Sequence, residues 1–221
     1  MSKEYRTEYA RSEFDSWSRR YDLSPLQWLF FQPSHRMMLR HLEPSDRDIL
    51  DIGCGTGNFA LRIVEQFSHT RVWGLDLSAG MLGHARMRCR IHRRVSVVQG
   101  DSERLPFADD SFDAVTCCHS FHHYPKQESV VAEMHRVLRP GGRLVIVDGD
   151  RDRLWGRFLF DRLVVFMEGA VKHLSGDAFK SLFHKIGFDE VHQQRRRGFL
   201  PFLLTVGRAV KPALAPMRQA A

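Results

Sequence analysis

The sequence from residue 48 to residue 149 alternates short apolar runs with longer helix-like stretches, and this alternation restricts the fold more than any other feature. Runs that are apolar at nearly every position predict strands that are covered on both faces. Strands that alternate with helices predict parallel βαβ units, so we predict an α/β fold with a Rossmann-like, mostly parallel sheet and helices on both faces. The predicted strands are 48–53, 72–77, 95–101, 112–120 and 143–149, and the predicted helices are 58–67, 79–91 and 128–138.

The segments outside this pattern differ in character. Residues 1–47 are partly amphipathic and are broken by prolines, which predicts an N-terminal helical cap. The strongly apolar stretch 152–174 predicts a helical insert within the ligand-binding domain 48–210. The tail 211–221 contains two prolines and is predicted to be disordered.

Residues 175–209 extend the predicted sheet. Ser175 and Asp177 are the candidate cap residues for a helix within 175–188, and Gly187 is its candidate terminator. Two further stretches, 189–195 and 200–209, predict strands that pair as an antiparallel hairpin at the sheet edge. A turn is predicted earlier, at RPGG (139–142).

A glycine loop, LDIGCGTG (50–57), follows the first predicted strand. Ligands of open parallel sheets bind beyond the carboxyl ends of the strands, where the strand order reverses. Glycines permit positive φ angles and let a ligand approach the main chain, and the start of the following helix attracts negative charge. The loop therefore predicts a nucleotide-like cofactor.

Two cofactors compete for this loop. A dinucleotide-binding G-x-G-x-x-G pattern would place its third glycine at position 58, which is Asn58 here. The Asp51 carboxylate would also repel a pyrophosphate. S-adenosylmethionine (SAM) carries an ammonium group that suits Asp51 and a carboxylate that suits the helix start. The sequence favours SAM.

Two further acids end the next predicted strands. Asp76 stands at the interval expected for an acid that binds ribose hydroxyls. Asp101 can accept a hydrogen bond from an adenine amino group, the Ser102 N–H can donate to the ring, and Leu77 and Met81 can flank it. Each acid alone could instead cap a helix, but three at successive strand ends favour a shared ligand.

Four stretches stand in the order and at the intervals of a known family: LDIGCGTG, GLDLS, GDSERLPFADDSFDAV and VLRPGGRLVIVD. The chain resembles the class I SAM-dependent methyltransferases, of the methyltransferase-11 type, strongly over about residues 45–150. The resemblance implies a seven-stranded sheet with one antiparallel strand, SAM as cofactor and S-adenosylhomocysteine as product. The implied and predicted cofactor contacts are Asp51, Gly53, Cys54, Gly55, Thr56, Gly57, Asp76, Leu77, Met81, Asp101, Ser102, Cys117 and His119.

Within this class the chain is similar to the ubiquinone/menaquinone-biosynthesis methyltransferases. FDSWSRRYD (14–22) and RVLRPGG (136–142) resemble segments of that group. The stretch 24–38 departs from the group's pattern, and Gly149 stands where those enzymes usually have an acid. The resemblance therefore leaves the methyl acceptor open, together with its acceptor atom.

The expected reaction is an in-line displacement at an activated methyl group. Alignment of the reactants can contribute about 7–11 kcal/mol, so no catalytic triad is required. If a general base exists, His119 and His123 of HSFHH (119–123) are the candidates, because they follow the fourth strand. The alternative is a structural turn. No metal site is expected, because the histidines lack a nearby pattern of acids or cysteines.

Aromatic side chains outside the sheet indicate the acceptor. Tyr21 and Trp28 from the N-terminal cap and Phe158 from the apolar insert are the predicted substrate contacts. Phe30 and Phe31 of the cap are predicted to line the same pocket. The insert could be a packing helix, a pocket roof or a dimer contact. We predict a small or medium-sized, partly apolar acceptor.

The charge pattern leaves other partners open. The net charge is +7, with basic clusters at 86–94 and 195–197. A solvated face explains them, and an RNA or anionic membrane partner is the alternative. The other function classes are an RNA methyltransferase, although CCHS (117–120) replaces its usual N-P-P-Y-type loop, and a non-catalytic SAM-binding interaction protein.

Composition indicates the compartment. The four cysteines form no C-x-x-C pair, which disfavours a disulfide framework and fits a reducing cytoplasm. The N-terminus has no apolar core and is not a signal peptide, and no stretch reaches the roughly 18 apolar residues of a membrane span. We predict a cytoplasmic monomer or homodimer.

Overall fold

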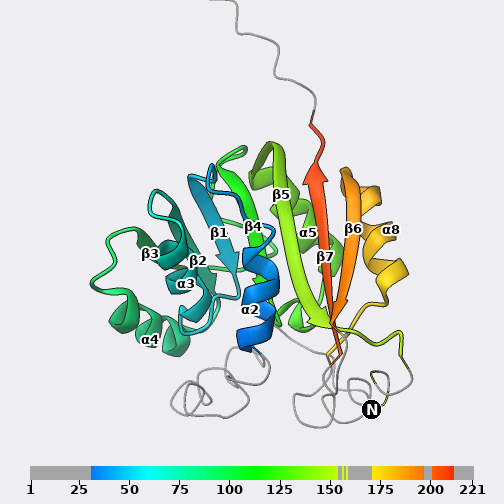
Figure 1. The fold of residues 1–221 in the computed structure, drawn as a ribbon, viewed down its shortest axis with the longest axis horizontal. Coiled ribbons are helices and arrows are strands. Elements are labelled where there is room, and N and C mark those ends of the chain that lie inside the picture. Colours follow the sequence, from blue (N-terminus) through cyan, green and yellow to red (C-terminus); the bar gives the residue numbers. More distant parts are fainter. Residues whose placement is uncertain (1–30, 154–155, 157, 159–170, 197–200, 212–221) are drawn as a thin grey trace, which may run out of the picture.

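The computed structural model describes residues 31–153, 156, 158, 171–196 and 201–211, and within them seven strands form one sheet. The sheet order is β3-β2-β1-β4-β5-β7-β6, and β7 is the strand that runs antiparallel to its neighbours (Figure 1). This order confirms the predicted fold class. The strands are β1 Asp48–Ile52, β2 Arg71–Asp76, β3 Val95–Gln99, β4 Phe112–Cys118, β5 Leu138–Gly149, β6 Phe188–Arg196 and β7 Phe202–Ala209.

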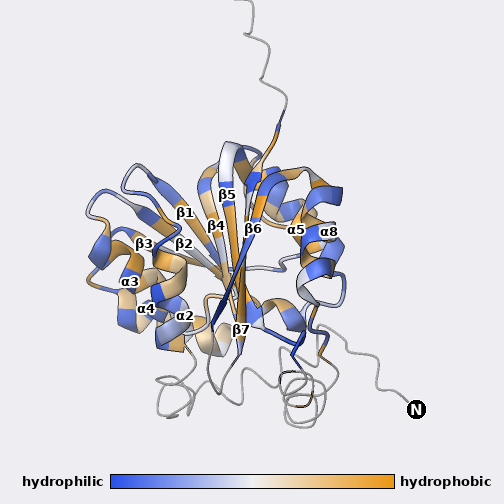
Figure 2. Ribbon diagram, turned by 45° about the vertical axis from the view of Figure 1, so that its right-hand side comes forward, coloured by the Kyte–Doolittle hydropathy of each residue, from blue (hydrophilic) through white to orange (hydrophobic). Residues whose placement is uncertain are grey.

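Helices cover both faces of the sheet. They are α2 Gln32–Leu39, α3 Asn58–Gln66, α4 Ala79–Cys89, the short 3-10 helix η2 Phe121–His123, α5 Gln127–Val137 and α8 Gly176–Ile186. Apolar strands lie between helices whose outer faces are polar (Figure 2). On its apolar face, α3 buries Phe59, Ile63 and Val64, and α8 buries Phe179 and Phe183.

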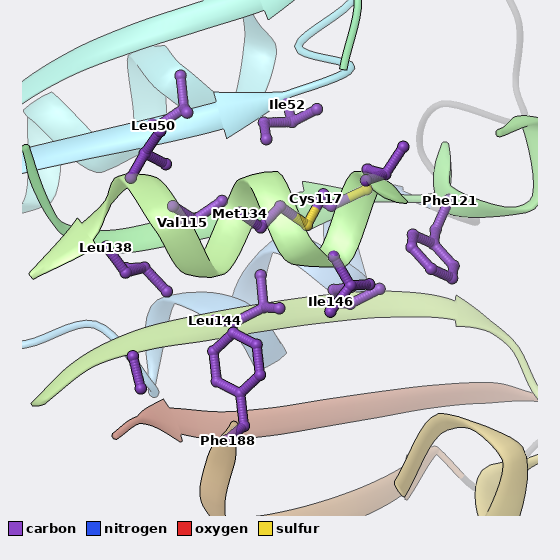
Figure 3. Packing of buried hydrophobic residues seen from close by; sticks show 14 of the residues in the cluster. Leu50, Ile52, Val115, Cys117, Phe121, Met134, Leu138, Leu144, Ile146 and Phe188 are labelled. Atoms are coloured by element: carbon purple, nitrogen blue, oxygen red, sulfur yellow. The ribbon is translucent and has the colours of Figure 1, made fainter. Parts of the chain in front are cut away.

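The strand side chains alternate between two apolar clusters. On β1, Ile49 packs with the buried residues of α2 and α3, whereas Leu50 and Ile52 pack with those of α5 and α8. Figure 3 shows Leu50 and Ile52 beside Met134 of α5 and Ile146 of β5. Each such side chain contributes about 1.5–3 kcal/mol when it is fully buried, so the two clusters fix the register of the sheet.

The predicted C-terminal hairpin is confirmed, because β6 and β7 form an antiparallel pair at one edge of the sheet. Within the pair, β7 lies between β5 and β6, with Arg143 opposite Arg208 and Gly149 opposite Phe202, so that β6 is the outermost strand on this side. The physical reason is burial. β7 is apolar on both faces, whereas β6 alternates exposed polar residues with partly buried ones, as an edge strand does.

The predicted turn at 139–142 belongs to β5 as an irregular stretch. Phe112 pairs with Leu138 and Ala114 pairs with Arg143, so four residues of β5 are accommodated beside Asp113. Gly141 takes a positive φ of 76° there, which a side chain would disfavour.

Much of the predicted cap, insert and tail lies outside the described residues. Of the cap, residues 31–47 are described, including α2, and of the insert, residues 152–153, 156, 158 and 171–174. The three domain boundaries therefore stay predictions. Within the described ranges, no helix is both long enough and apolar enough to cross a bilayer.

A buried ion pair joins β5 to the loop before β1. The Arg143 guanidinium donates to both carboxylate oxygens of Asp46, with 2.6 Å from Nη2 to Oδ2, and both residues are buried. Removing one partner leaves a buried, uncompensated charge. We expect Arg143→Leu to lower the free energy of unfolding by about 3–5 kcal/mol, measured by urea denaturation.

The exposed pair between Lys185 and Glu128, 2.7 Å apart, is the matched control. Lys185→Leu should cost no more than about 1 kcal/mol, because solvent screens this pair. If both variants lost the same free energy of unfolding, the stabilising role assigned to the buried Arg143–Asp46 pair would be contradicted.

Candidate active site

A pocket opens at the carboxyl ends of β1, β2, β3 and β4, beside α2. The sheet order reverses between β1 and β4, which is where open α/β sheets bind ligands. Figure 1 shows these strand ends and α2 on the same side of the sheet. The structure brings together there the predicted residues Asp51, Gly53, Cys54, Gly55, Thr56, Asp76, Leu77, Met81, Asp101, Ser102, His119 and His123.

The glycine loop is anchored to the end of β2. The backbone N–H groups of Gly53 and Cys54 both donate to the Leu75 carbonyl, at 2.8 and 3.1 Å. Gly53 has a φ of 68°, and a Cβ on it would lie 2.2 Å from the Ser120 hydroxyl oxygen. Only glycine fits this position, so the close approach of the loop to β4 depends on it.

Asp51 lies at the bottom of the pocket and is almost fully buried. The Thr116 hydroxyl donates to its Oδ1 at 2.8 Å. Burial, opposed by the Thr116 hydrogen bond and assisted by the neighbouring Asp76 carboxylate, raises the pKa of Asp51 to about 7. No ion pair to Asp51 occurs among the described residues. The carboxylate therefore lacks a cation, which an ammonium group in the pocket would supply.

Asp76 and Asp101 are held by main-chain donors. Asp76 Oδ2 accepts from Gly55 N at 2.8 Å and Oδ1 from Ser78 N at 2.9 Å, which ties the end of β2 to the glycine loop. Asp101 Oδ1 accepts from Glu103 N at 2.9 Å. A carboxylate oxygen accepts two hydrogen bonds, so both acids keep acceptor capacity for a ligand.

Arg88 of the basic stretch 86–94 also supports the loop. Its Nη1 donates to the carbonyl and to the hydroxyl oxygen of Thr56, at 2.7 and 2.8 Å. In the same stretch, Arg94 donates to the carbonyls of Val64, Phe67 and Thr70. These arginines bind the protein's own backbone, which is a structural use of part of the cluster.

His119 follows β4 at the pocket wall. Its φ is 50°, in the left-handed region, and its Nε2 lies 2.7 Å from the Ser34 hydroxyl of α2. Burial lowers the pKa of His119 to about 4, so the ring is neutral near pH 7. His123 also lines the pocket, and burial, followed by the neighbouring His122, lowers its pKa.

A second histidine cluster lies next to the pocket. His122 Nδ1 is 2.7 Å from Asp148 Oδ1, and the His122 backbone N–H donates to Asp148 Oδ2 at 3.0 Å. The His173 ring stacks on His122 with 4.3 Å between centroids, and its Nε2 is 3.7 Å from Asp148 Oδ1. Burial would raise the pKa of Asp148, but His122 and His173 outweigh it and lower the pKa below its usual range. All three residues are buried.

This cluster corrects one premise of the sequence analysis, that no acid lies near the histidines. Asp148 and His173 are 26 and 51 positions away from His122 in the chain, and only the fold brings them together. Their ligand atoms lie within 4.8 Å of one another, as in a metal site. The 2.7 Å between His122 Nδ1 and Asp148 Oδ1 is nevertheless a hydrogen-bond distance, whereas two ligands of tetrahedral zinc lie about 3.3 Å apart. The geometry is that of a buried charge cluster.

The sequence analysis missed His35 at the pocket wall, whereas Phe31 lines the pocket from the N-terminal side as predicted. His35 lies within α2, and Phe31 is the residue before it. The ring of His35 packs on the ring of Phe59, with 4.7 Å between their centroids. Phe31 meets the His119 ring edge-on at 5.4 Å. A single histidine in an amphipathic helix gives no sequence signal for a pocket, because its direction depends on how the helix docks.

Comparison with known proteins now adds to this geometry. Residues 50–146 match the methyltransferase domain family. The demethylmenaquinone methyltransferase of Geobacillus kaustophilus is 32% identical over 165 residues, which cover 64% of this chain and 70% of that protein. This chain belongs to the class I SAM-dependent methyltransferase family.

Other relatives of this methyltransferase chain agree. The demethylmenaquinone methyltransferase of Deinococcus radiodurans is 40% identical over 108 residues, or 48% of this chain, and the chain spans only 45% of its length. The structure of a SAM-dependent methyltransferase from Thermotoga maritima shares the fold, with a TM-score of 0.73 at 24% identity over 90% of this chain and 99% of that one. The family implies SAM as the cofactor.

Two predicted cofactor contacts of this methyltransferase chain do not line the pocket. Cys117 points into the apolar cluster on the α5 face, and its neighbour Cys118 lines the pocket, because successive strand residues face opposite sides. Gly57 begins α3 with a φ of 79°, and a Cβ there would meet Cys89 Sγ at 3.1 Å. Its observed role is the packing of α3 on α4.

The predicted substrate contacts remain predictions. Tyr21 and Trp28 lie outside the described residues. Phe158 is 59% exposed and is not among the residues that line the pocket. Arg195 of the second basic stretch forms an ion pair with Asp152.

The fit of the glycine loop against β4 yields a test. We expect Gly53→Ala to weaken SAM binding by at least about tenfold, since the new methyl group would clash with Ser120 and the positive φ would be strained. Isothermal titration calorimetry measures the affinity. Gly83→Ala is the control, because no atom lies within 4 Å of its Cβ and alanine favours the α4 helix. Equal affinities in the two variants would refute the role assigned to Gly53.

Proposed function

We propose that this chain transfers the methyl group of SAM to a small or medium-sized acceptor with a largely apolar body. The observation that carries the proposal is the convergence of three strand-end acids, Asp51, Asp76 and Asp101, with the glycine loop on one pocket. In this proposal Asp51 binds the ammonium group, Asp76 the ribose hydroxyls and Asp101 the adenine amino group.

The buried Asp51 carboxylate fits this cofactor better than a dinucleotide. Its raised pKa and the lack of a cation among the described residues favour a positively charged ligand group. A pyrophosphate would add negative charge beside Asp51 and Asp76. Leu77 and Met81 supply apolar surface on the same wall, which suits a purine ring.

SAM, when bound, supplies a methyl group that is already activated on a sulfonium. That methyl carbon would bond to the acceptor atom as its bond to sulfur breaks, and the electron pair of that bond would remain on sulfur. The chain's own contribution is to align the acceptor and exclude water, which needs no triad. His119 is the proposed proton acceptor, because its ring is neutral and lines the pocket beside α2.

The pocket wall supports an acceptor that contains a ring. Phe31, Phe59 and Tyr124 contribute aromatic surface between α2, α3 and η2. The names of the relatives, demethylmenaquinone and ubiquinone/menaquinone-biosynthesis methyltransferases, support a reduced quinone as the first acceptor to test. The internal contacts of Arg88, Arg94 and Arg195 remove three arginines from any RNA-binding surface and weigh against RNA as the acceptor.

The role of Asp51 predicts a pH-dependent affinity for SAM. The ammonium group requires the carboxylate form, so a carboxyl with a pKa of about 7 must release a proton on binding. We expect the affinity to rise between about pH 5.5 and 7.5, and calorimetry in buffers of different ionisation enthalpy to detect proton release. Asp51→Asn should bind about 10- to 100-fold more weakly near pH 7.5, with no such pH dependence.

Thr116 can donate to the amide oxygen of the substituted side chain as it does to the carboxylate, so this variant should keep its fold. An unchanged affinity in Asp51→Asn, with the same pH profile as the wild type, would remove Asp51 from the cofactor site.

A methyl-transfer assay tests the proposed activity. With methyl-labelled SAM, we expect label in a reduced short-chain demethylmenaquinone and none in structured RNA. His119→Asn keeps a residue that tolerates the left-handed backbone but removes the base, and should lower kcat by at least about 100-fold with little effect on the KM for SAM. His123→Asn is the comparison. Full turnover in His119→Asn would reject the base, and transfer to RNA alone would reject the small-molecule acceptor.

A further inference from the structure

We propose that His35 is part of an acceptor-binding subsite, where it forms a hydrogen bond with a neutral hydroxyl group of the methyl acceptor. This inference rests on the proposed methyltransferase function and extends it to the chemical class of the substrate. It places a hydroxyl-bearing apolar ring, such as a phenol or a hydroquinone, between α2 and the end of β4.

The first observation is the state of the His35 ring. His35 is 4% exposed and lines the pocket. Neither ring nitrogen has a hydrogen-bond partner among the described residues, and Nδ1 is fully buried. Because Nδ1 is closed off from the pocket, Nε2 is the ring nitrogen that a ligand can reach. Polar atoms in protein interiors are nearly always paired, so the unpaired Nε2 in a pocket wall indicates a partner that the ligand supplies.

The second observation is the rigid setting of this ring. It packs at 4.7 Å on Phe59 of α3 and at 6.1 Å from Phe31, between ring centroids. Phe31 in turn meets His119, which the Ser34 hydroxyl holds from the same helix. His35 and His119 therefore belong to one aromatic wall, and a group bound at His35 lies on the side of the pocket where the proposed base stands.

The third observation is charge. Burial, together with the charges of Arg62 and His119, lowers the pKa of His35 to about 3, so that the ring is neutral near pH 7. The His119 ring is neutral as well, and Asp51 contributes negative charge to the same pocket. Neither imidazole attracts a carboxylate or phosphate under these conditions. A neutral imidazole has one donor and one acceptor nitrogen, and a hydroxyl group can satisfy either.

Two naphthalene derivatives test the class of acceptor. The probes are 2-naphthol, neutral near pH 7, and 2-naphthoate, an anion of similar shape, each titrated with and without saturating S-adenosylhomocysteine. We expect the wild type to bind 2-naphthol at least about 10-fold more tightly than 2-naphthoate. Tighter binding of 2-naphthoate, or no binding of 2-naphthol in either condition, would overturn the inference.

Variants of His35 test the residue. His35→Phe keeps a flat ring without nitrogens and should bind 2-naphthol about 5- to 10-fold more weakly, with an unchanged affinity for S-adenosylhomocysteine. His35→Gln keeps a polar group near the Nε2 position and should recover part of the loss. The exposed His69, far from the pocket lining, provides the control variant His69→Phe.

The outcomes separate the two proposals. Wild-type protein that binds 2-naphthol but no S-adenosylhomocysteine would overturn the proposed function. A His35→Phe variant that loses S-adenosylhomocysteine but keeps 2-naphthol would assign His35 to the cofactor and overturn the inference alone. If His35→Phe does not fold, the comparison of His35→Asn, which has no polar group at the Nε2 position, with the wild type decides, and equal 2-naphthol affinities would contradict the role of His35.

Discussion

The carboxylate of Asp51, buried beneath the glycine loop without a cation among the described residues, is the interaction on which the site depends. Its pKa in the folded chain, about 7, lies above that of an exposed aspartate. The protonated carboxyl therefore stabilises the fold fully below about pH 4, and this contribution is lost as the pH rises through about 7. Near neutral pH the free protein holds an unfavourable buried charge, and a ligand ammonium group relieves it. The affinity for a cationic ligand thus comes from an unfavourable feature of the free state.

The fold explains why this charge can be kept. Asp51 lies near the end of β1 next to β4, where the strand order reverses and the pocket opens. The two apolar clusters fix the register of β1, and this register keeps the Asp51 carboxylate on the face of the sheet that borders the pocket. Gly53 lets the loop pass close to Ser120, and Arg88 holds the next turn at Thr56. The sheet thus positions the Asp51 carboxylate, and α4 supports the glycine loop.

The sequence predicted most of this arrangement, because the part of the pocket around the glycine loop is built from consecutive strand ends. Asp51, Asp76 and Asp101 each follow an apolar run, so that local pattern and parallel topology place them together. The misses have a different origin. Cys118 rather than Cys117 lines the pocket because a one-residue change of phase exchanges the faces of a strand.

The α2 wall of the pocket and the neighbouring charge cluster depend on contacts between segments that are distant in the chain. His35 lines the pocket because of how α2 docks, and Asp148 meets His122 and His173 because of how β5, η2 and the segment before α8 meet. No periodicity within one segment encodes such contacts. The insertion of β7 between β5 and β6 follows from its burial on both faces, which its apolar sequence does show but which the hairpin pattern alone did not resolve.

A crystal structure of the protein with S-adenosylhomocysteine tests the central claim most directly. The account predicts that the ligand's amino nitrogen lies within about 2.7–3.2 Å of an Asp51 carboxylate oxygen. An amino group directed elsewhere, or a nicotinamide dinucleotide that takes this pocket in preference to the nucleoside, would contradict it.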